Sequence, residues 1–334
     1  MCLTPAKTDP KTSNPFAKAR RMQQPKTLLI LTAAILFVGK TSLATALESA
    51  PNQGTPAASA SEFESDTADL KTLPVVWVNV AKGELKVFGK LVDGKRETLF
   101  TTKISIGRNG SGKTKSGDQK TPVGIYKTKK FIERKDLPRR YGNGAFTLNY
   151  PNHYDKILDR TGDGIWIHGR PSDKEDAPYL DTKGCVVMDN ENLNKLREFI
   201  QPHGTTVIIS DEFDPTDQNP NQNTIIKRIQ NWSNAWVSLD HESYMDFYDK
   251  SFFNGSRNYA DWDNYKGRIN AFKSFINIQL SDFEILNYPE EEDLIWVSFQ
   301  QSYASSNYNW EGRKITLWKK DNRHRWKIVF EGDE

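Results

Sequence analysis

A cysteine and a histidine that could act together as a nucleophile lie in one stretch of the chain. Cys185 follows His168 by 17 positions (185 − 168). A thiolate attacks carbonyl carbon atoms, and a neighbouring imidazole can take up the thiol proton, so these two residue types supply the reactive parts of an acyl-transfer site. The alternative is a structural cysteine buried beside an unrelated histidine.

Short elements around the pair would hold both side chains in place. The apolar run Ile165–Ile167 predicts a buried strand that ends at His168, and Gly169 allows the chain to turn there. The run Lys183–Cys185 predicts a tight turn, whose backbone N–H groups could stabilise an oxyanion beside the sulfur. The sequence therefore predicts a rigid strand end for the histidine and a tight turn for the cysteine.

The cysteine count favours a reactive thiol. The chain has two cysteines, and Cys2 lies ahead of a predicted export signal. If that signal is removed, Cys185 is the one thiol left and cannot form a disulfide within the chain. A reactive role then explains Cys185 better than a structural one.

The pair belongs to a longer motif, I-H-G at residues 167–169 and T-K-G-C-V-V-M at residues 182–188. This motif resembles the active-site signature of the YkuD family of L,D-transpeptidases, which reads HG, then S-x-G-C, a hydrophobic residue and Arg. Several upstream segments also resemble the family and follow in its order: Val76–Val80, Leu85–Phe88, Ile104–Gly107 and Thr121–Tyr126. The resemblance covers residues 74–211.

The resemblance implies a mostly-β catalytic domain of YkuD type that acts on peptidoglycan stem peptides without a cofactor. Cys185 would attack the stem at the bond between the L-centre of the third residue and the fourth D-residue. His168 would accept the thiol proton and pass it to the departing amine. The carbonyl of Gly169 would orient the imidazole, and the N–H groups of Gly184 and Cys185 would stabilise the oxyanion.

Three substrate-binding residues are implied as well: Thr182, Lys183 and Arg170. The motif departs from the family pattern at two of these and at one further position. Thr182 stands where Ser is usual, Lys183 where His is common, and Val187 replaces the Arg that usually follows the cysteine–hydrophobic pair. An arginine there could hold a carboxylate through two hydrogen bonds, and valine cannot.

Two alternatives to transpeptidation stay open. A YkuD-like domain followed by a second α+β domain resembles the L,D-carboxypeptidases that trim tetrapeptide stems to tripeptides in curved bacteria, where cell shape depends on the wall. A non-catalytic module that binds the cell wall is less favoured, because His168, Gly184 and Cys185 are intact. Thiol labelling separates these classes, since an activated cysteine of low pKa alkylates quickly near neutral pH.

The N-terminus predicts an exported protein. Residues 1–46 combine a basic start, the apolar run Leu28–Val38 and an A-x-A pattern at Ala44–Ala46, as in a secretory signal peptide. This run of eleven residues, apolar except for Thr32, is short for a bilayer span, so an uncleaved anchor is the less favoured alternative. We expect a location in the periplasm or cell envelope, with membrane contact only through the signal. Residues 47–73, rich in Ala, Ser and Pro, predict a flexible tether.

Charge does not point to a nucleic-acid partner. Residues 1–46 hold seven Lys/Arg and one Asp, so removing them changes the formal net charge from +3 to −3. Basic residues also recur between Lys113 and Arg140, either as a solvated surface or as an attraction for acidic stem peptides. The histidines share no metal-ligand spacing with one another or with Cys185, so no metal site is predicted.

One motif imitates a nucleotide site. Gly107–Thr114 matches G-x-x-x-x-G-K-[ST], but a P-loop must open a helix whose N-terminus faces the phosphates. The residues that follow, 116–124, contain Gly and Pro and break helices. We therefore expect no nucleotide binding, a flexible loop beside the cleft, and a dispensable Lys113.

A second domain follows a turn-rich linker at residues 212–223. Within residues 224–334, the helical spacing of Ile225, Ile229, Trp232 and Trp236 predicts an amphipathic helix with a buried aromatic face. Three strand-like runs close the chain, at residues 293–303, 314–319 and 325–330. This pattern resembles the cone-shaped α+β fold of the SnoaL and nuclear-transport-factor superfamily, which hosts many functions. We expect the second domain to melt separately from the first.

Overall fold

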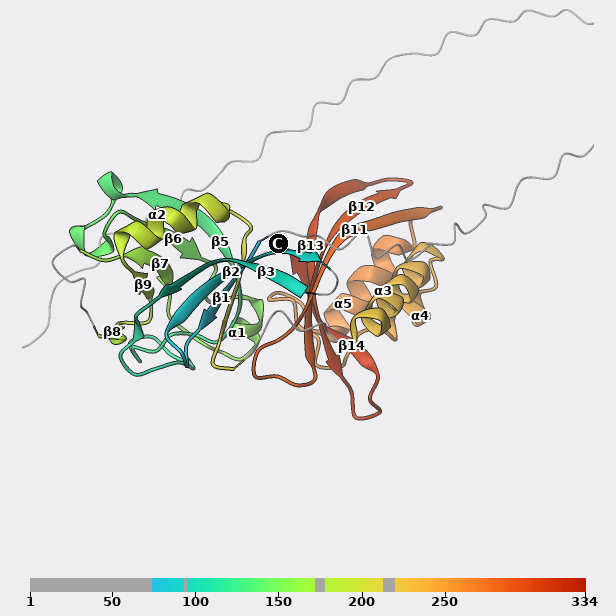
Figure 1. Ribbon diagram of the computed structural model, residues 1–334. Coiled ribbons are helices and arrows are strands. Elements are labelled where there is room, and N and C mark those ends of the chain that lie inside the picture. Colours follow the sequence, from blue (N-terminus) through green and yellow to red (C-terminus); the bar gives the residue numbers. More distant parts are fainter. Residues whose placement is uncertain (1–73, 93–94, 172–177, 213–219) are drawn as a thin grey trace, which may run out of the picture. The chain divides into compact units, whose positions relative to one another are not determined.

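The computed structural model describes residues 74–92, 95–171, 178–212 and 220–334, which belong to one compact unit (Figure 1). The predicted signal peptide, the predicted tether and most of the predicted linker lie outside the described residues. Among the described residues, no helix is long and apolar enough to cross a membrane.

The first part of the described chain is built on an eight-stranded mixed sheet. From one edge to the other it contains β3 (Lys95–Lys103), β2 (Glu84–Val92), β1 (Val75–Asn79), β10 (Thr206–Ser210), β5 (Gly124–Glu133), β6 (Gly144–Leu148), β7 (Trp166–Gly169) and β9 (Val186–Met188). Two short strands, β4 (Ile106–Gly107) and β8 (Leu180–Thr182), form a separate parallel pair.

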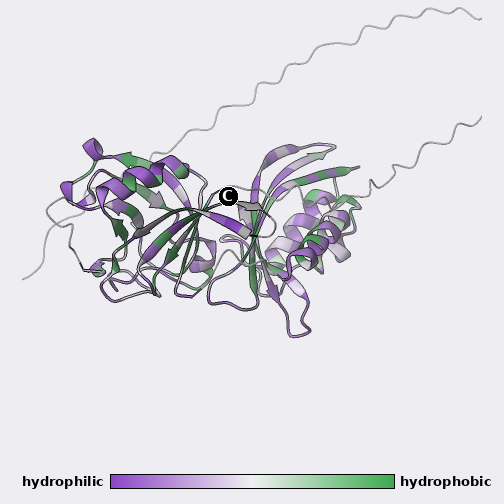
Figure 2. Ribbon diagram, in the orientation of Figure 1, coloured by the Kyte–Doolittle hydropathy of each residue, from purple (hydrophilic) through white to green (hydrophobic). Residues whose placement is uncertain are grey.

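The middle of this sheet is apolar on both faces. Every residue of β1 (V-V-W-V-N) and of β10 (T-V-I-I-S) is buried, and the two strands pair in parallel. Parallel strands covered on both faces read as continuous β-branched runs, as these do. Figure 2 shows apolar residues along the inner strands and polar residues along the connecting loops.

Two helices belong to this part. The short α1 (His153–Ile157) begins at a capping box, in which Asn152 and Asp155 each bind the other's backbone N–H. The longer α2 (Asn190–Phe199) buries Leu193 and Leu196. Because α2 lies against β7, it supports the strand that carries His168.

The C-terminal part consists of helices packed on an antiparallel meander. The helices are α3 (Gln222–Val237), α4 (His241–Met245) and α5 (Tyr259–Asn270), and the strands, in spatial and chain order, are β11 (Ile276–Asn287), β12 (Leu294–Ser305), β13 (Asn309–Lys320) and β14 (Trp326–Asp333). The predicted aromatic face of α3 is confirmed, since Trp232 and Trp236 are buried. Helix α5 and strand β11 were not predicted. The fold class, a mostly-β domain plus an α+β domain, is confirmed.

A shared core joins the two parts. Trp77 of β1 and Tyr154 of α1 belong to the same apolar cluster as Trp296 of β12. Lys127, expected among exposed basic residues, is instead buried and pairs with Glu284 of β11 at 3.2 Å. An apolar cluster with a buried ion pair makes the two parts energetically dependent on each other.

Candidate active site

His168 is fixed at the end of a buried strand. It lies in β7, opposite Ala145 of β6 and opposite Val187 of β9. Its side chain is buried, and its ring meets the Tyr141 ring edge-on at a centroid distance of 4.8 Å. The histidine is therefore delivered rigidly, as its sequence predicted.

The protonation state of His168 suits a base. Burial lowers its pKa to about 4, and the charges of Arg170 and Arg140 act in the same direction, against the opposing effect of the Gly169 carbonyl. Nδ1 lies 2.6 Å from that carbonyl oxygen, the contact predicted for Gly169. Since a carbonyl only accepts hydrogen bonds, Nδ1 is the protonated nitrogen, and the Nε2 lone pair is left to accept a proton.

Cys185 directly precedes the neighbouring strand, β9. Val187 pairs with His168 in parallel register, so their side chains share a face of the sheet. Cys185 lies two residues before Val187, between the bend at Lys183–Gly184 and the first residue of β9. The strand that carries His168 thus pairs with the strand that directly follows Cys185.

Backbone groups surround the sulfur. Cys185 Sγ donates to the carbonyl of Gly164 at 3.3 Å. Burial raises the pKa of the Cys185 thiol, whereas the backbone of Trp166 and the charge of Lys113 oppose that rise. The resting thiol is therefore protonated at neutral pH.

The predicted turn before Cys185 is held by one hydroxyl. Thr182 Oγ1 accepts a hydrogen bond from the Gly184 N–H at 3.0 Å and donates to the Cys185 carbonyl at 2.7 Å. Gly184 has φ 124°, and a Cβ there would lie 2.6 Å from the carbonyl oxygen of Lys120, so the position needs glycine. The Gly184 N–H is engaged within the turn here, which differs from its predicted role as an oxyanion donor.

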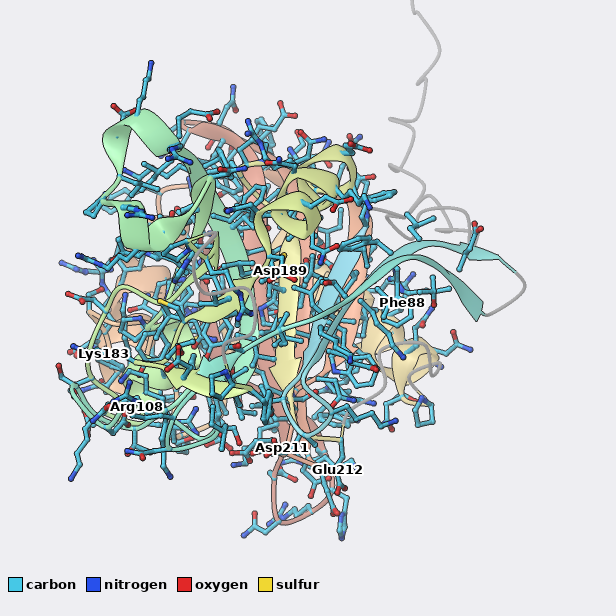
Figure 3. All side chains as sticks on the ribbon, turned by 60° about the vertical axis from the view of Figure 1, so that its left-hand side comes forward. Phe88, Arg108, Lys183, Asp189, Asp211 and Glu212 are labelled. Atoms are coloured by element: carbon cyan, nitrogen blue, oxygen red, sulfur yellow. The ribbon has the colours of Figure 1, made fainter. Side chains whose placement is uncertain are left out.

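The three predicted substrate-binding residues lie in different settings. Thr182 holds the turn, as described, and Lys183 is exposed at its tip (Figure 3). Arg170 is buried, donates to Ser105 Oγ at 3.1 Å and forms an ion pair with Asp189 at 3.1 Å. Lys183 is thus placed to meet a ligand, whereas Arg170 braces the strands beneath the site.

Some contacts of the site were not predicted from the sequence. Thr121 Oγ1 donates to the carbonyl of Gly184 at 3.1 Å and accepts from the Gly107 N–H at 2.9 Å. Thr121 lies in the segment Thr121–Tyr126, which resembles the family, but the sequence did not indicate that its hydroxyl would bind the Gly184 carbonyl. The Gly164 carbonyl carries no signal at all, because every residue has one. Tyr141, from a 3₁₀ turn, likewise has no motif around it.

A hollow lies in the C-terminal part. It has a volume of about 580 Å³, and its lining includes Trp236, Trp262 and the buried Lys266. The aromatic face of α3 is therefore core along most of its length and cavity wall at Trp236. Within the described ranges, no three His, Cys, Asp or Glu side chains are arranged to hold a metal ion.

Comparisons with known proteins agree with this architecture. Residues 74–209 match the L,D-transpeptidase catalytic domain of the YkuD family, and residues 224–332 match the Cds6 C-terminal NTF2-like domain. A search of curated protein sequences gave no match.

Two solved structures resemble most of the chain. The helical cell shape determining protein Pgp2 from Campylobacter jejuni is 30% identical, with a TM-score of 0.67 over 78% of this chain and 92% of that chain. Bd1075 of Bdellovibrio bacteriovorus is 28% identical, with a TM-score of 0.65 over 80% of this chain and 96% of that chain. The chain therefore belongs to the family of proteins in which a YkuD L,D-transpeptidase catalytic domain is followed by an NTF2-like domain.

Proposed function

We propose that the protein is an exported peptidoglycan L,D-transpeptidase that works through an acyl-enzyme on Cys185. The observation that supports the proposal is the pairing of β7, which holds a neutral, oriented His168, with β9, the strand that Cys185 directly precedes. Family membership supports a cell-wall substrate, and a wall substrate requires a location in the periplasm or cell envelope.

The first half-reaction would break the stem peptide. His168 Nε2 removes the thiol proton as Sγ attacks the carbonyl carbon, and a carbon–sulfur bond forms. The carbon–nitrogen bond to the fourth residue then breaks, and the imidazolium returns its proton to the departing amine. Because both groups begin neutral, the proton transfer accompanies attack rather than preceding it.

Oxyanion stabilisation would come from the turn. With the Gly184 N–H held by Thr182, the Cys185 N–H is the donor that we assign to the oxyanion. Exposed Lys183 at the tip of the turn, beside Arg108, offers positive charge to the free carboxylates of stem peptides. Arg108 is joined to the segment before the turn, since its N–H donates to the Thr182 carbonyl at 2.8 Å.

The second half-reaction decides between transfer and hydrolysis. An amine acceptor gives a cross-link, whereas water gives an L,D-carboxypeptidase. Hydrolysis is the second candidate, because Val187 puts a buried aliphatic side chain where relatives carry a cation, in register with His168. An acceptor that is not positioned loses the effective-molarity advantage by which an amine competes with water.

Product analysis of a defined tetrapeptide muropeptide separates these outcomes. Liquid chromatography with mass spectrometry, over a range of acceptor concentrations, measures the ratio of cross-linked dimer to tripeptide. Dimer that rises with acceptor supports transpeptidation, and tripeptide alone at every concentration assigns the carboxypeptidase. Val187→Arg should raise the dimer-to-tripeptide ratio. No conversion by the wild-type protein would contradict both candidates.

A further inference from the structure

The loop that imitates a P-loop is closed by a buried ion pair. Lys113 is 4% exposed, and its Nζ lies 2.7 Å from Asp118 Oδ1 and 3.0 Å from the carbonyl of Lys115. Asp118 also accepts the N–H groups of Thr114 and Lys115 at 2.9 and 3.0 Å. The segment after Thr114 forms turns rather than a helix. One carboxylate therefore satisfies several donors of this loop.

Although partial burial would raise the pKa of Asp118, the hydrogen bonds from Lys113 and from three backbone N–H groups hold it below its usual range. The carboxylate therefore stays charged at any pH at which the enzyme would work. A charged Asp118 in turn keeps the Lys113 ammonium in one place.

The closed loop reaches the Cys185 turn from one side. The Lys113 N–H donates to the carbonyl of Thr121 at 3.2 Å, and Thr121 Oγ1 donates to the carbonyl of Gly184 at 3.1 Å. Lys120, between the ion pair and Thr121, places its carbonyl where a Cβ on Gly184 would lie 2.6 Å away. The position of the Cys185 turn thus depends on the conformation that Lys113 and Asp118 impose.

The same loop reaches the segment on the other side of the sulfur. The N–H of Thr161 donates to the carbonyl of Thr114 at 3.0 Å, and the N–H of Ser116 donates to Thr161 Oγ1 at 3.2 Å. A Cβ on Gly162 would lie 3.2 Å from Lys113 Cε and 3.6 Å from its Nζ. Two residues further on, the carbonyl of Gly164 accepts the Cys185 thiol.

We propose that Lys113 is a positioning residue for the nucleophile: held by Asp118, it fixes both segments that flank Cys185 Sγ and supplies positive charge that favours the thiolate. The charge is consistent with the lowering effect of Lys113 on the Cys185 pKa. The carboxylate of Asp118, 2.7 Å from Lys113 Nζ, offsets part of this charge, whereas His168 is neutral at pH 7 and Trp166 acts through its backbone. Lys113 is therefore not dispensable.

The proposal rests on the proposed function only in taking Cys185 as the nucleophile, and its test needs no muropeptide. The rate of Cys185 alkylation by iodoacetamide is measured against pH in the purified full chain, and mass spectrometry of the Cys185 peptide separates it from Cys2. Wild-type failure to convert muropeptide would defeat the proposed function and leave the alkylation test intact.

Two variants break the same ion pair and differ in the charge that remains. Lys113→Met removes the cation, so alkylation at pH 7 should fall about threefold to tenfold and its pH midpoint should rise. Asp118→Asn keeps a side-chain oxygen that can accept hydrogen bonds within the loop but removes the counter-charge of Lys113, so alkylation at pH 7 should not slow. Lys195→Met is the matched control, because Lys195 forms a 2.9 Å ion pair with Glu191 on the exposed face of α2. Cys185 in Lys195→Met should be alkylated at the wild-type rate.

Either of two results overturns the proposal. Equal slowing in Lys113→Met and Asp118→Asn would mean that the pair only holds the loop. If the alkylation rate of Lys113→Met depended on pH as the wild-type rate does, neither the charge nor the position of Lys113 would affect the reactivity of Cys185. Melting temperatures are recorded for every variant, and Lys113→Gln gives the same comparison should Lys113→Met fail to fold.

Discussion

Two lysines in this molecule are equally buried and are held in opposite ways. Lys113, beside the candidate nucleophile, and Lys266, in the C-terminal hollow, are each 4% exposed. Lys113 has a carboxylate at 2.7 Å. Lys266 lies over the rings of Trp236 and Trp262, with Nζ 3.8 and 4.7 Å from their centroids. In the part of the chain that the structure describes, Lys266 has no carboxylate within ion-pair distance.

The difference shows that burial alone does not set the role of a charged side chain. In the loop, the attraction of Asp118 and the hydrogen bonds around it offset the cost of removing a charge from water. In the hollow, aromatic faces offset only part of that cost, and burial lowers the pKa of Lys266 to about 8. The charges of the Lys113 loop are thus satisfied within the loop, and the hollow retains a destabilising charge.

The largest expected change in stability follows from truncating Trp236, one of the aromatic side chains beneath Lys266. Trp236→Ala removes a buried ring that also contacts Trp232 and Tyr303, at centroid distances of 5.5 and 5.3 Å. Truncating a buried aromatic side chain costs about 3–5 kcal/mol of unfolding free energy. Denaturant unfolding measures the change. Phe272→Ala, at an 81% exposed position, is the control and should stay within roughly 0.5 kcal/mol of wild type.

The same variant tests whether the two parts unfold together. Because Trp77 and Trp296 share one core, Trp236→Ala should shift a single melting transition, contrary to the separate melting that the sequence suggested. Calorimetry that resolves two transitions, with only one of them shifted, would break the account of a shared core.

The next largest change in stability is expected for Lys266→Met and tests whether the charge of Lys266 destabilises the fold. The folded pKa of Lys266 is below its ordinary value of 10.5, so the charged form destabilises the fold at every pH below about 8. Lys266→Met should then raise the unfolding free energy at pH 7 by about 2–3 kcal/mol. The gain should shrink as the pH rises from 8 towards 10.5, since the wild-type lysine loses its proton. Unfolding curves at pH 7 and pH 10 check both statements.

The smallest effect belongs to the paired lysine and has the opposite sign. Lys113→Met should lower the unfolding free energy at pH 7 by about 1–2 kcal/mol, because it removes a charge-assisted hydrogen bond. The pKa of Asp118 is lowered on folding, so its contribution is present above the unfolded value and is lost as the pH falls through the folded one. The difference in unfolding free energy between the wild-type protein and Lys113→Met should therefore become smaller below about pH 4. If Lys113→Met were instead more stable than wild type at pH 7, Lys113 and Lys266 would not differ in their effect on stability.

The sequence predicted those parts of the fold and site that residue types specify. The spacing of Trp232 and Trp236 identified the buried face of α3, and the apolar run Ile165–Ile167 identified β7. Strand β11 was missed because its alternation is interrupted. A bulge between Ser281 and Glu284, with Asp282 at φ 51°, shifts the inward-facing positions by one.

The parts that were missed depend on backbone groups and on long-range pairing. The Gly164 carbonyl that holds the thiol has no side-chain signature. Gly and Asp are as frequent in a loop closed by a buried ion pair as in an open one, so the role of Lys113 could not be read from composition. The engagement of the Gly184 N–H by Thr182 requires the folded turn.

The central claim is that Cys185 carries the acyl group. Intact-protein mass spectrometry, after rapid acid quenching of the wild-type protein with tetrapeptide muropeptide, tests it most directly. The account predicts a mass increase equal to the stem acyl group, located on the peptide that contains Cys185, and neither adduct nor products from Cys185→Ala. Product formation by Cys185→Ala at the wild-type rate would contradict it.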